Sequence, residues 1–281
     1  DLLCSPVLRA RLVTGRRVVA SPAYLKRLRL PLLMLALLAL AGWLLRDVIL
    51  PQPPLLPAGV LRVGVDPSSP PFAYYEGNAL VGLEIDLSTA LGDRLGVPVQ
   101  LVALGFDGLY DALRADQADV IIAATSPDPQ RTVDVIFSRP YFDNGLLIVS
   151  PASAPLPAMQ VVAGRELALA FGSSAHTEAN RWLRRVAAFT IRPYELPLYA
   201  LDAVRLGDAD AALVSAVDAY LYLRDYPDWE PHTAYVTHAP YVAAVNSQRG
   251  KLAAALDSAI DALQSDGTLA QLTARWLYSP A

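Results

Sequence analysis

The sequence predicts an α/β fold of two lobes, preceded by one transmembrane helix. Three observations lead to this prediction. An uncharged apolar run occupies residues 30–45. Alternating strand and helix patterns then occur twice, once in residues 61–124 and again in residues 166–214. Two extended stretches, 141–149 and 235–245, allow the chain to cross from one α/β unit to the other and back.

The apolar run is the expected membrane anchor. It raises the mean hydropathy of the chain to +0.33. Its 16 uncharged residues fall short of the roughly 20 that span a bilayer, but a snorkelling Arg46 extends the segment to residue 50. Trp43 suits the membrane interface. A cleaved signal peptide, with Ala39 and Ala41 at its cleavage site, and a buried core helix are the alternatives.

Charge divides the chain at the same place. Residues 1–58 carry 8 Lys/Arg and 2 Asp/Glu, whereas residues 59–281 carry 15 and 25. The basic flank should stay in the cytoplasm and direct the rest outward. We therefore predict an extracytoplasmic domain, in the periplasm or at the cell surface, anchored to the cytoplasmic membrane. Its acidic balance argues against a nucleic-acid partner, and the single cysteine, Cys4, precludes a disulfide framework.

The predicted organisation has five parts. A basic cytoplasmic segment (1–29) precedes the transmembrane anchor (30–50). Four prolines within residues 51–57 predict a stiff linker, to which we assign residues 51–58. The two lobes complete the prediction: lobe 1 from residues 59–142 and 240–281, and lobe 2 from residues 143–239.

Periodicity and end signals predict the individual elements. A leucine at every fourth position predicts a helix at residues 83–95, and Gly96 and Pro98 supply its stop signal. The other expected strands lie at 61–65, 99–102, 119–124, 166–171, 189–192 and 211–214. The other expected helices lie at 106–115, 174–186, 198–206, 251–264 and 269–277. The two crossings between the units predict a hinge, and hinged lobes close on ligands.

Three stretches, residues 61–96, 106–142 and 262–276, resemble the family 3 bacterial extracellular solute-binding proteins. The resemblance implies a type II periplasmic-binding fold, also called a Venus flytrap. It further implies a protein that is not an enzyme, with no cofactor and no metal. Such a protein captures a small polar carboxylate, with an amino acid as the expected ligand, for an ABC permease in the membrane.

The resemblance assigns ligand-binding roles to five residues of lobe 1. Arg131 matches the arginine that pairs with the ligand α-carboxylate, and the guanidinium fork suits that partner. Ala124 and Ser126 match positions that offer a backbone group and a hydroxyl. Phe106 matches an apolar wall residue, and Asp66 matches an acidic position after the first strand.

In lobe 2, Ser173 and Ser174 follow Gly172 and resemble a turn whose N–H groups and hydroxyls bind a carboxylate. A helix N-cap alone explains one of these serines. The pair at the start of a helix therefore indicates a double role, in capping and in ligand binding.

Two further ligand-binding positions depart from the family pattern. Ser69 replaces an aromatic residue that stacks on the ligand. Ser215 replaces an aspartate that holds the ligand ammonium group, and a hydroxyl does not neutralise a buried cation. Either Asp218, about one helical turn further on, reaches back to the site, or the ligand lacks an α-ammonium group.

Other functions fit the same fold. A ligand-sensing receptor subunit is the main alternative. A dehydratase-like enzyme would need a general acid in the cleft, for which Asp66 is the one candidate, and a purely structural pair of lobes is a further alternative. The three histidines show no metal-ligand spacing. The acidic pair Glu84 and Asp86 is interpreted as favouring the dipole of the helix that begins there.

Overall fold

The computed structural model describes residues 34–36, 38–41 and 55–278. The chain divides into two units, residues 1–53 and 54–281. Residues 34–36 and 38–41 of the first unit are helical. The rest of the predicted anchor lies outside the described residues, as do the predicted cytoplasmic segment and residues 51–54 of the predicted linker. No helix within the described ranges has the length and apolar character that a membrane crossing requires.

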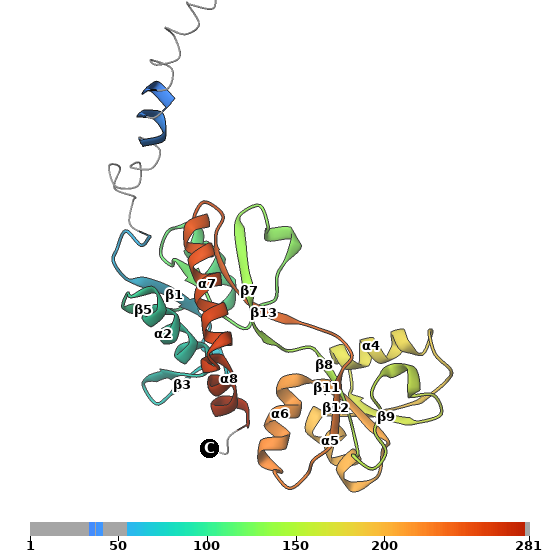
Figure 1. Ribbon diagram of the computed structural model, residues 1–281. Helices are drawn as coiled ribbons and strands as arrows, with labels where there is room; N and C mark the ends of the chain where they lie inside the picture. Colours follow the sequence, from blue (N-terminus) through green and yellow to red (C-terminus); the bar gives the residue numbers. More distant parts are fainter. Residues whose placement is uncertain (1–33, 37, 42–54, 279–281) are drawn as a thin grey trace, which may run out of the picture. The chain divides into compact units, whose positions relative to one another are not determined.

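The second unit contains two five-stranded sheets, and we call the parts built around them lobe 1 and lobe 2 (Figure 1). The lobe 1 sheet has the order β5-β1-β6-β13-β7. β1 pairs in parallel with β5 and β6, whereas β13 runs antiparallel to β6 and β7. These strands are β1 (Leu61–Val65), β5 (Val99–Ala103), β6 (Val120–Ile121), β7 (Val135–Asp143) and β13 (Pro240–Asn246).

The leucine stripe forms a helix as predicted. Leu83, Leu87 and Leu91 are completely buried on α2 (Leu83–Leu95). The helix ends at Gly96, whose left-handed conformation suits a residue without a side chain. Lobe 1 also contains α3 (Phe106–Arg114), α7 (Gly250–Ser265), α8 (Thr268–Thr273) and a π-helical turn, η3 (Ala274–Tyr278).

Two features of lobe 1 differ from the prediction. A small antiparallel sheet, β2 (Ser68–Ser69), β3 (Ala73–Glu76) and β4 (Ala79–Val81), was not expected because its strands are too short for a recognisable pattern. The strand expected at 119–124 is reduced to β6, which ends at Ile121, and the chain reaches a positive φ of 43° at Ala124.

The lobe 2 sheet has the order β10-β9-β11-β8-β12, with β9 parallel to β10 and β11. Its strands are β8 (Leu146–Ser150), β9 (Glu166–Ala170), β10 (Thr190–Tyr194), β11 (Ala211–Ser215) and β12 (His232–Tyr235). Its helices are α4 (Ser174–Trp182), α5 (Pro197–Leu206) and α6 (Ala216–Asp225), with α4 ending four residues earlier than predicted. Two apolar clusters pack within the lobe.

The two lobes are joined by the β7–β8 connection and the β12–β13 connection, which run close together. The N–H of Asn144 donates to the carbonyl of Ala239 at 3.0 Å. A Cβ atom on Gly145 would lie 1.9 Å from the carbonyl oxygen of Thr237, so glycine alone fits this crossing. The carboxylate of Asp143 accepts the N–H groups of Gly145 and Ala239, at 2.9 Å each.

His238 completes this hinge by contacting the second Asp143 oxygen through Nδ1 at 2.5 Å. Burial disfavours the charged form of Asp143, but the contact with His238 and the two backbone N–H groups hold the pKa of Asp143 below its usual value. The hinge is therefore fixed by a charged carboxylate bonded to both connections.

Candidate ligand-binding site

Three of the predicted ligand residues meet in lobe 2. Ser173, Ser174 and Ser215 line one pocket of about 40 Å³, together with Asp218. Ser173 and Ser174 stand where β9 gives way to α4, and Ser215 stands where β11 gives way to α6. Polar groups at the carboxyl ends of neighbouring strands are typical of ligand sites in α/β folds.

The N-terminus of α4 contains one serine that caps the helix and one whose side chain is exposed. Ser173 is the N-cap: its Oγ accepts the N–H of His176 at 3.2 Å and donates to the carbonyl of Ala170 at 2.7 Å. Ser174 is exposed. Within the described part of the chain, the N–H groups of Ser174 and Ala175 have no acceptor. These two N–H groups and the Ser174 hydroxyl can therefore receive a carboxylate.

The N-terminus of α6 is occupied by its own chain. The N–H of Ala216 donates to the carbonyl of Gly145 at 2.9 Å, and the N–H of Val217 donates to Asn144 Oδ1 at 3.1 Å. The N–H of Asp218 donates to Ser215 Oγ at 3.1 Å, which makes Ser215 an N-cap. The start of α6 is thereby bonded to the hinge and is not free to bind an anion.

Asp218 places a carboxylate beside Ser215. The Ser215 hydroxyl donates to Asp218 Oδ2 at 2.6 Å, so the acidic group lies directly beside the position of the family aspartate. Asp218 is half-buried and lines the pocket. The expectation that Asp218 reaches back by one helical turn agrees with this geometry. The pocket is therefore lined both by free N–H groups and by a carboxylate.

A wider cavity of about 420 Å³ shares Ser174 and Leu146 with this pocket. It extends along α4 to the hinge, where Asn144, Thr237 and Ala239 line it, and its other lining residues are Thr177, Glu178 and Arg181. Glu178 is buried and accepts a bond from Arg181 at 3.0 Å. The lobe 2 pocket therefore adjoins a polar space beside the hinge.

In lobe 1 the predicted residues are distributed over several elements. Asp66 is buried at the end of β1, and its Oδ1 accepts the N–H and the hydroxyl of Ser68 at 3.1 and 2.8 Å. Ser69 is half-buried on β2, and Ser126 is exposed. Phe106 is the first residue of α3 and is 47% exposed.

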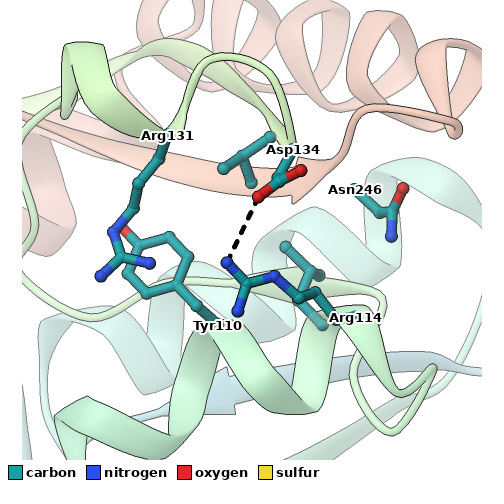
Figure 2. Close-up of a pocket in the computed structure, with 7 residues that line it drawn as sticks. Tyr110, Arg114, Arg131, Asp134 and Asn246 are labelled. Atoms are coloured by element: carbon teal, nitrogen blue, oxygen red, sulfur yellow. Dashed lines mark hydrogen bonds and ion pairs between the residues drawn. The ribbon is translucent and has the colours of Figure 1, made fainter.

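Arg131 lies over an aromatic ring (Figure 2). Its guanidinium is 3.9 Å from the centre of the Tyr110 ring, and Nε is 3.3 Å from a carboxylate oxygen of Asp128. It lines a small pocket of about 10 Å³ that also contains Arg114, which pairs with Asp134 at 3.3 Å. Arg131 does not line the pockets of Ser173, Ser174 and Ser215. Its role as the carboxylate partner remains a prediction.

The sequence interpretation missed the role of Glu84. Glu84 and Asp86 do lie in the first turn of α2, but Glu84 is completely buried. Its Oε1 accepts both the N–H of Ala124 and the hydroxyl of Tyr141, each at 2.5 Å. Asp86 accepts bonds from Arg275 and from the indole of Trp276 instead. In the sequence, Glu84 and Asp86 are both acidic residues of a first helical turn. Only the tertiary packing distinguishes the buried Glu84 from Asp86.

Burial dominates the electrostatics of this carboxyl group. Loss of solvation raises the pKa of Glu84 to about 7, and the nearby Asp66 adds to the rise. The bonds from Tyr141 and Ala124 oppose it by stabilising the charged form. Burial and the neighbouring Glu84 in turn raise the pKa of Tyr141, which keeps its hydroxyl protonated. Within the described ranges, no cluster of three His, Cys, Asp or Glu side chains has the geometry of a metal site.

Comparison with known proteins agrees with this architecture. The model of the bacterial extracellular solute-binding proteins, family 3, matches residues 61–279. The chain is 23% identical to a probable amino-acid ABC transporter-binding protein of Haemophilus influenzae, over 77% of this chain and 84% of that protein. It is 26% identical to the L-cystine-binding protein TcyJ of Escherichia coli, over 78% of this chain and 82% of that protein.

The fold is also similar to a solved structure, that of the L-cystine solute receptor of Neisseria gonorrhoeae in its unliganded open conformation. The TM-score is 0.69 and the identity 22%, over 78% of this chain and 92% of the receptor. The family match spans both lobes and the hinge between them. The chain therefore belongs to the family 3 bacterial extracellular solute-binding proteins.

Proposed function

We propose that the chain is a membrane-tethered receptor that captures an amino acid outside the cytoplasm and delivers it to an ABC permease. Two relatives with similar coverage are named as an amino-acid ABC transporter-binding protein and an L-cystine-binding protein. The curated relatives are solute-binding proteins, which favours capture over catalysis.

One observation carries this proposal: the lobe 2 pocket is lined both by free N–H groups and by a carboxylate. The N–H groups of Ser174 and Ala175 complement a carboxylate, and the Asp218 carboxylate beside Ser215 complements an ammonium group. A zwitterionic amino acid carries both charges on neighbouring atoms. In this proposal Arg131 completes the carboxylate site from lobe 1 when the hinge closes.

The tether is proposed from the N-terminal unit. Within the described residues, Met34, Leu35 and Leu38 are apolar and at least 61% exposed. Exposed apolar side chains of this kind are stabilised by lipid. The basic flank before residue 30 gives the orientation. A tether of this kind keeps the receptor near its permease and raises the effective concentration.

A thermal-shift screen of the purified full chain in detergent tests the function. The ligands are the amino acids, the matching acids without the ammonium group, and the matching amines without the carboxylate. A ligand at 100 times its Kd adds about 2.7 kcal/mol of stability. A shift with amino acids alone is expected. A shift with deaminated acids would contradict the proposed binding of the ammonium group by Asp218. The absence of a shift with every compound would contradict amino-acid capture.

A further inference from the structure

Ala124 adopts a backbone conformation that needs an external support. Its φ of 43° lies in the left-handed region, which is uncommon for a residue with a side chain. Its N–H donates to Glu84 Oε1 at 2.5 Å. The carbonyl of the next residue, Thr125, accepts the N–H of Val242 at 3.0 Å. The segment from Ala124 to Ser126 is thus held by bonds from two other elements.

The group that supports Ala124 is the buried carboxyl group of Glu84. Glu84 is 0% exposed, and its Oε1 receives donors from Ala124 and from Tyr141 on β7. Its Oε2 is buried with no hydrogen-bond partner among the described residues. One oxygen therefore connects α2, the chain after β6, and β7, while the other is available to carry a proton.

We propose that Glu84 is a positioning residue, which holds the segment from Ala124 to Ser126 in its ligand-binding conformation and makes solute affinity depend on pH. The inference rests on the proposed function of amino-acid capture, together with the family resemblance, which assigns Ala124 and Ser126 to the ligand. Glu84 does not itself touch the solute in this proposal.

The surroundings of Glu84 determine when it gains its proton. Asp66 at the end of β1 is the charged group that acts on it, and the hydroxyls of Tyr141 and, on β13, Tyr241 are the other titratable neighbours. Burial raises the pKa of Glu84 to about 7. A neutral carboxyl accepts an N–H bond less strongly than a carboxylate does. The segment is therefore held more firmly at pH 8 than at pH 6.

The first test follows the Ala124 amide by NMR in the ligand-free full chain in detergent. Its chemical shift should titrate with a midpoint near pH 7, and the titration should vanish in Glu84→Gln. In Tyr141→Phe the midpoint should move to higher pH, because the lost hydroxyl stabilised the charged form. An Ala124 amide that stays constant between pH 5.5 and 8.5 would overturn the proposal.

The second test measures the Kd of an amino acid identified in the thermal-shift screen, by calorimetry at pH 6 and pH 8. The wild type should bind about 3- to 10-fold more tightly at pH 8, as expected from the greater strength of charge-assisted bonds. Glu84→Gln keeps an acceptor oxygen and should bind equally at both pH values. Glu84→Leu removes the acceptor and should weaken binding more than about tenfold.

Asp86→Asn is the matched control, because it removes an acidic group from the same helical turn without touching Ala124. It should retain the pH dependence of the wild type. A pH dependence that persists in Glu84→Gln overturns the coupling. If the wild type binds no amino acid, the proposed function fails, and the Ala124 titration still decides whether Glu84 positions this segment.

Discussion

The two lobes carry their acidic groups in different ways. In lobe 2, Asp218 lies in a pocket and bonds to Ser215, and Glu178 pairs with Arg181. In lobe 1, Glu84 is completely buried and contacts the predicted ligand segment only through a backbone N–H. The lobe 2 acids thus line cavities, whereas Glu84 is enclosed and bonds only to groups of its own lobe. Similar carboxyl groups take separate roles because burial and partners differ.

The burial of Glu84 should have its largest effect on the pH dependence of the stability of the folded chain. The pKa of Glu84 is about 7 in the folded chain, whereas an exposed glutamate has an ordinary value of about 4.5, so the folded state binds the proton more tightly. The stabilisation is complete below about pH 4.5 and is lost as the pH rises to about 7. At 1.36 kcal/mol per pKa unit, the loss is on the order of 3 kcal/mol.

Urea unfolding of the wild type and Glu84→Gln at pH 4.5 and 7.5 measures this loss. The wild type should lose on the order of 3 kcal/mol more than the variant between the two pH values. Equal losses in both proteins would mean that Glu84 is already ionised at pH 4.5, which would contradict the effect of burial on its pKa.

Asp218→Asn tests the lobe 2 side of the comparison. The substitution keeps the size of the side chain and the N–H bond to Ser215 but removes the charge opposite the ammonium group. Loss of one partner of a charge pair costs about 2–5 kcal/mol, so amino-acid affinity should fall about 100-fold. Affinity for a deaminated acid should be as weak as it is in the wild type. Calorimetry measures both.

Asp225→Asn is the control for that experiment, because Asp225 lies at the end of the same helix and its side chain is 63% exposed. It should bind as the wild type does. A loss in Asp225→Asn equal to that in Asp218→Asn would indicate a general effect of the charge of α6 and not a contact with the ammonium group.

The sequence predicted the elements whose apolar residues recur with a regular period. The stripe of Leu83, Leu87 and Leu91 defines α2 because a buried helix face needs an apolar side chain at each turn. The short strands β2 to β4 have too few residues for a period to be visible. Periodicity thus locates elements that pack along their whole length and misses those formed by a few residues.

The candidate site likewise has contacts that the sequence could predict and contacts that it could not. The link between Ser215 and Asp218 could be predicted, because residues three apart face each other across one helical turn. The role of Glu84 could not, because its partners Ala124 and Tyr141 are 40 and 57 residues away in the chain. Contacts within a turn follow from spacing, whereas contacts between elements depend on how the sheet places β6 and β7.

Arg131→Lys tests whether lobe 1 contributes a direct contact as well. Lysine keeps the charge but loses the planar fork that bonds a carboxylate with two N–H groups. We expect about a tenfold loss of amino-acid affinity, equivalent to about 1.4 kcal/mol. Arg139→Lys is the control, since Arg139 is exposed and pairs with Asp261. Unchanged affinity in Arg131→Lys would confine direct carboxylate binding to lobe 2.

The smallest effects are expected for Ser173→Ala and Ser174→Ala at the start of α4, and the two variants should differ in which property they change. Ser173 caps the helix, so Ser173→Ala should cost about 1 kcal/mol of stability. Ser174 is exposed and lines the pocket, so Ser174→Ala should leave the melting temperature unchanged and weaken affinity by up to about tenfold, the value of one hydrogen bond. Thermal melting and calorimetry on both variants measure the two effects. Equal losses of stability in both would assign Ser174 to the helix and leave the backbone N–H groups as the carboxylate site of lobe 2.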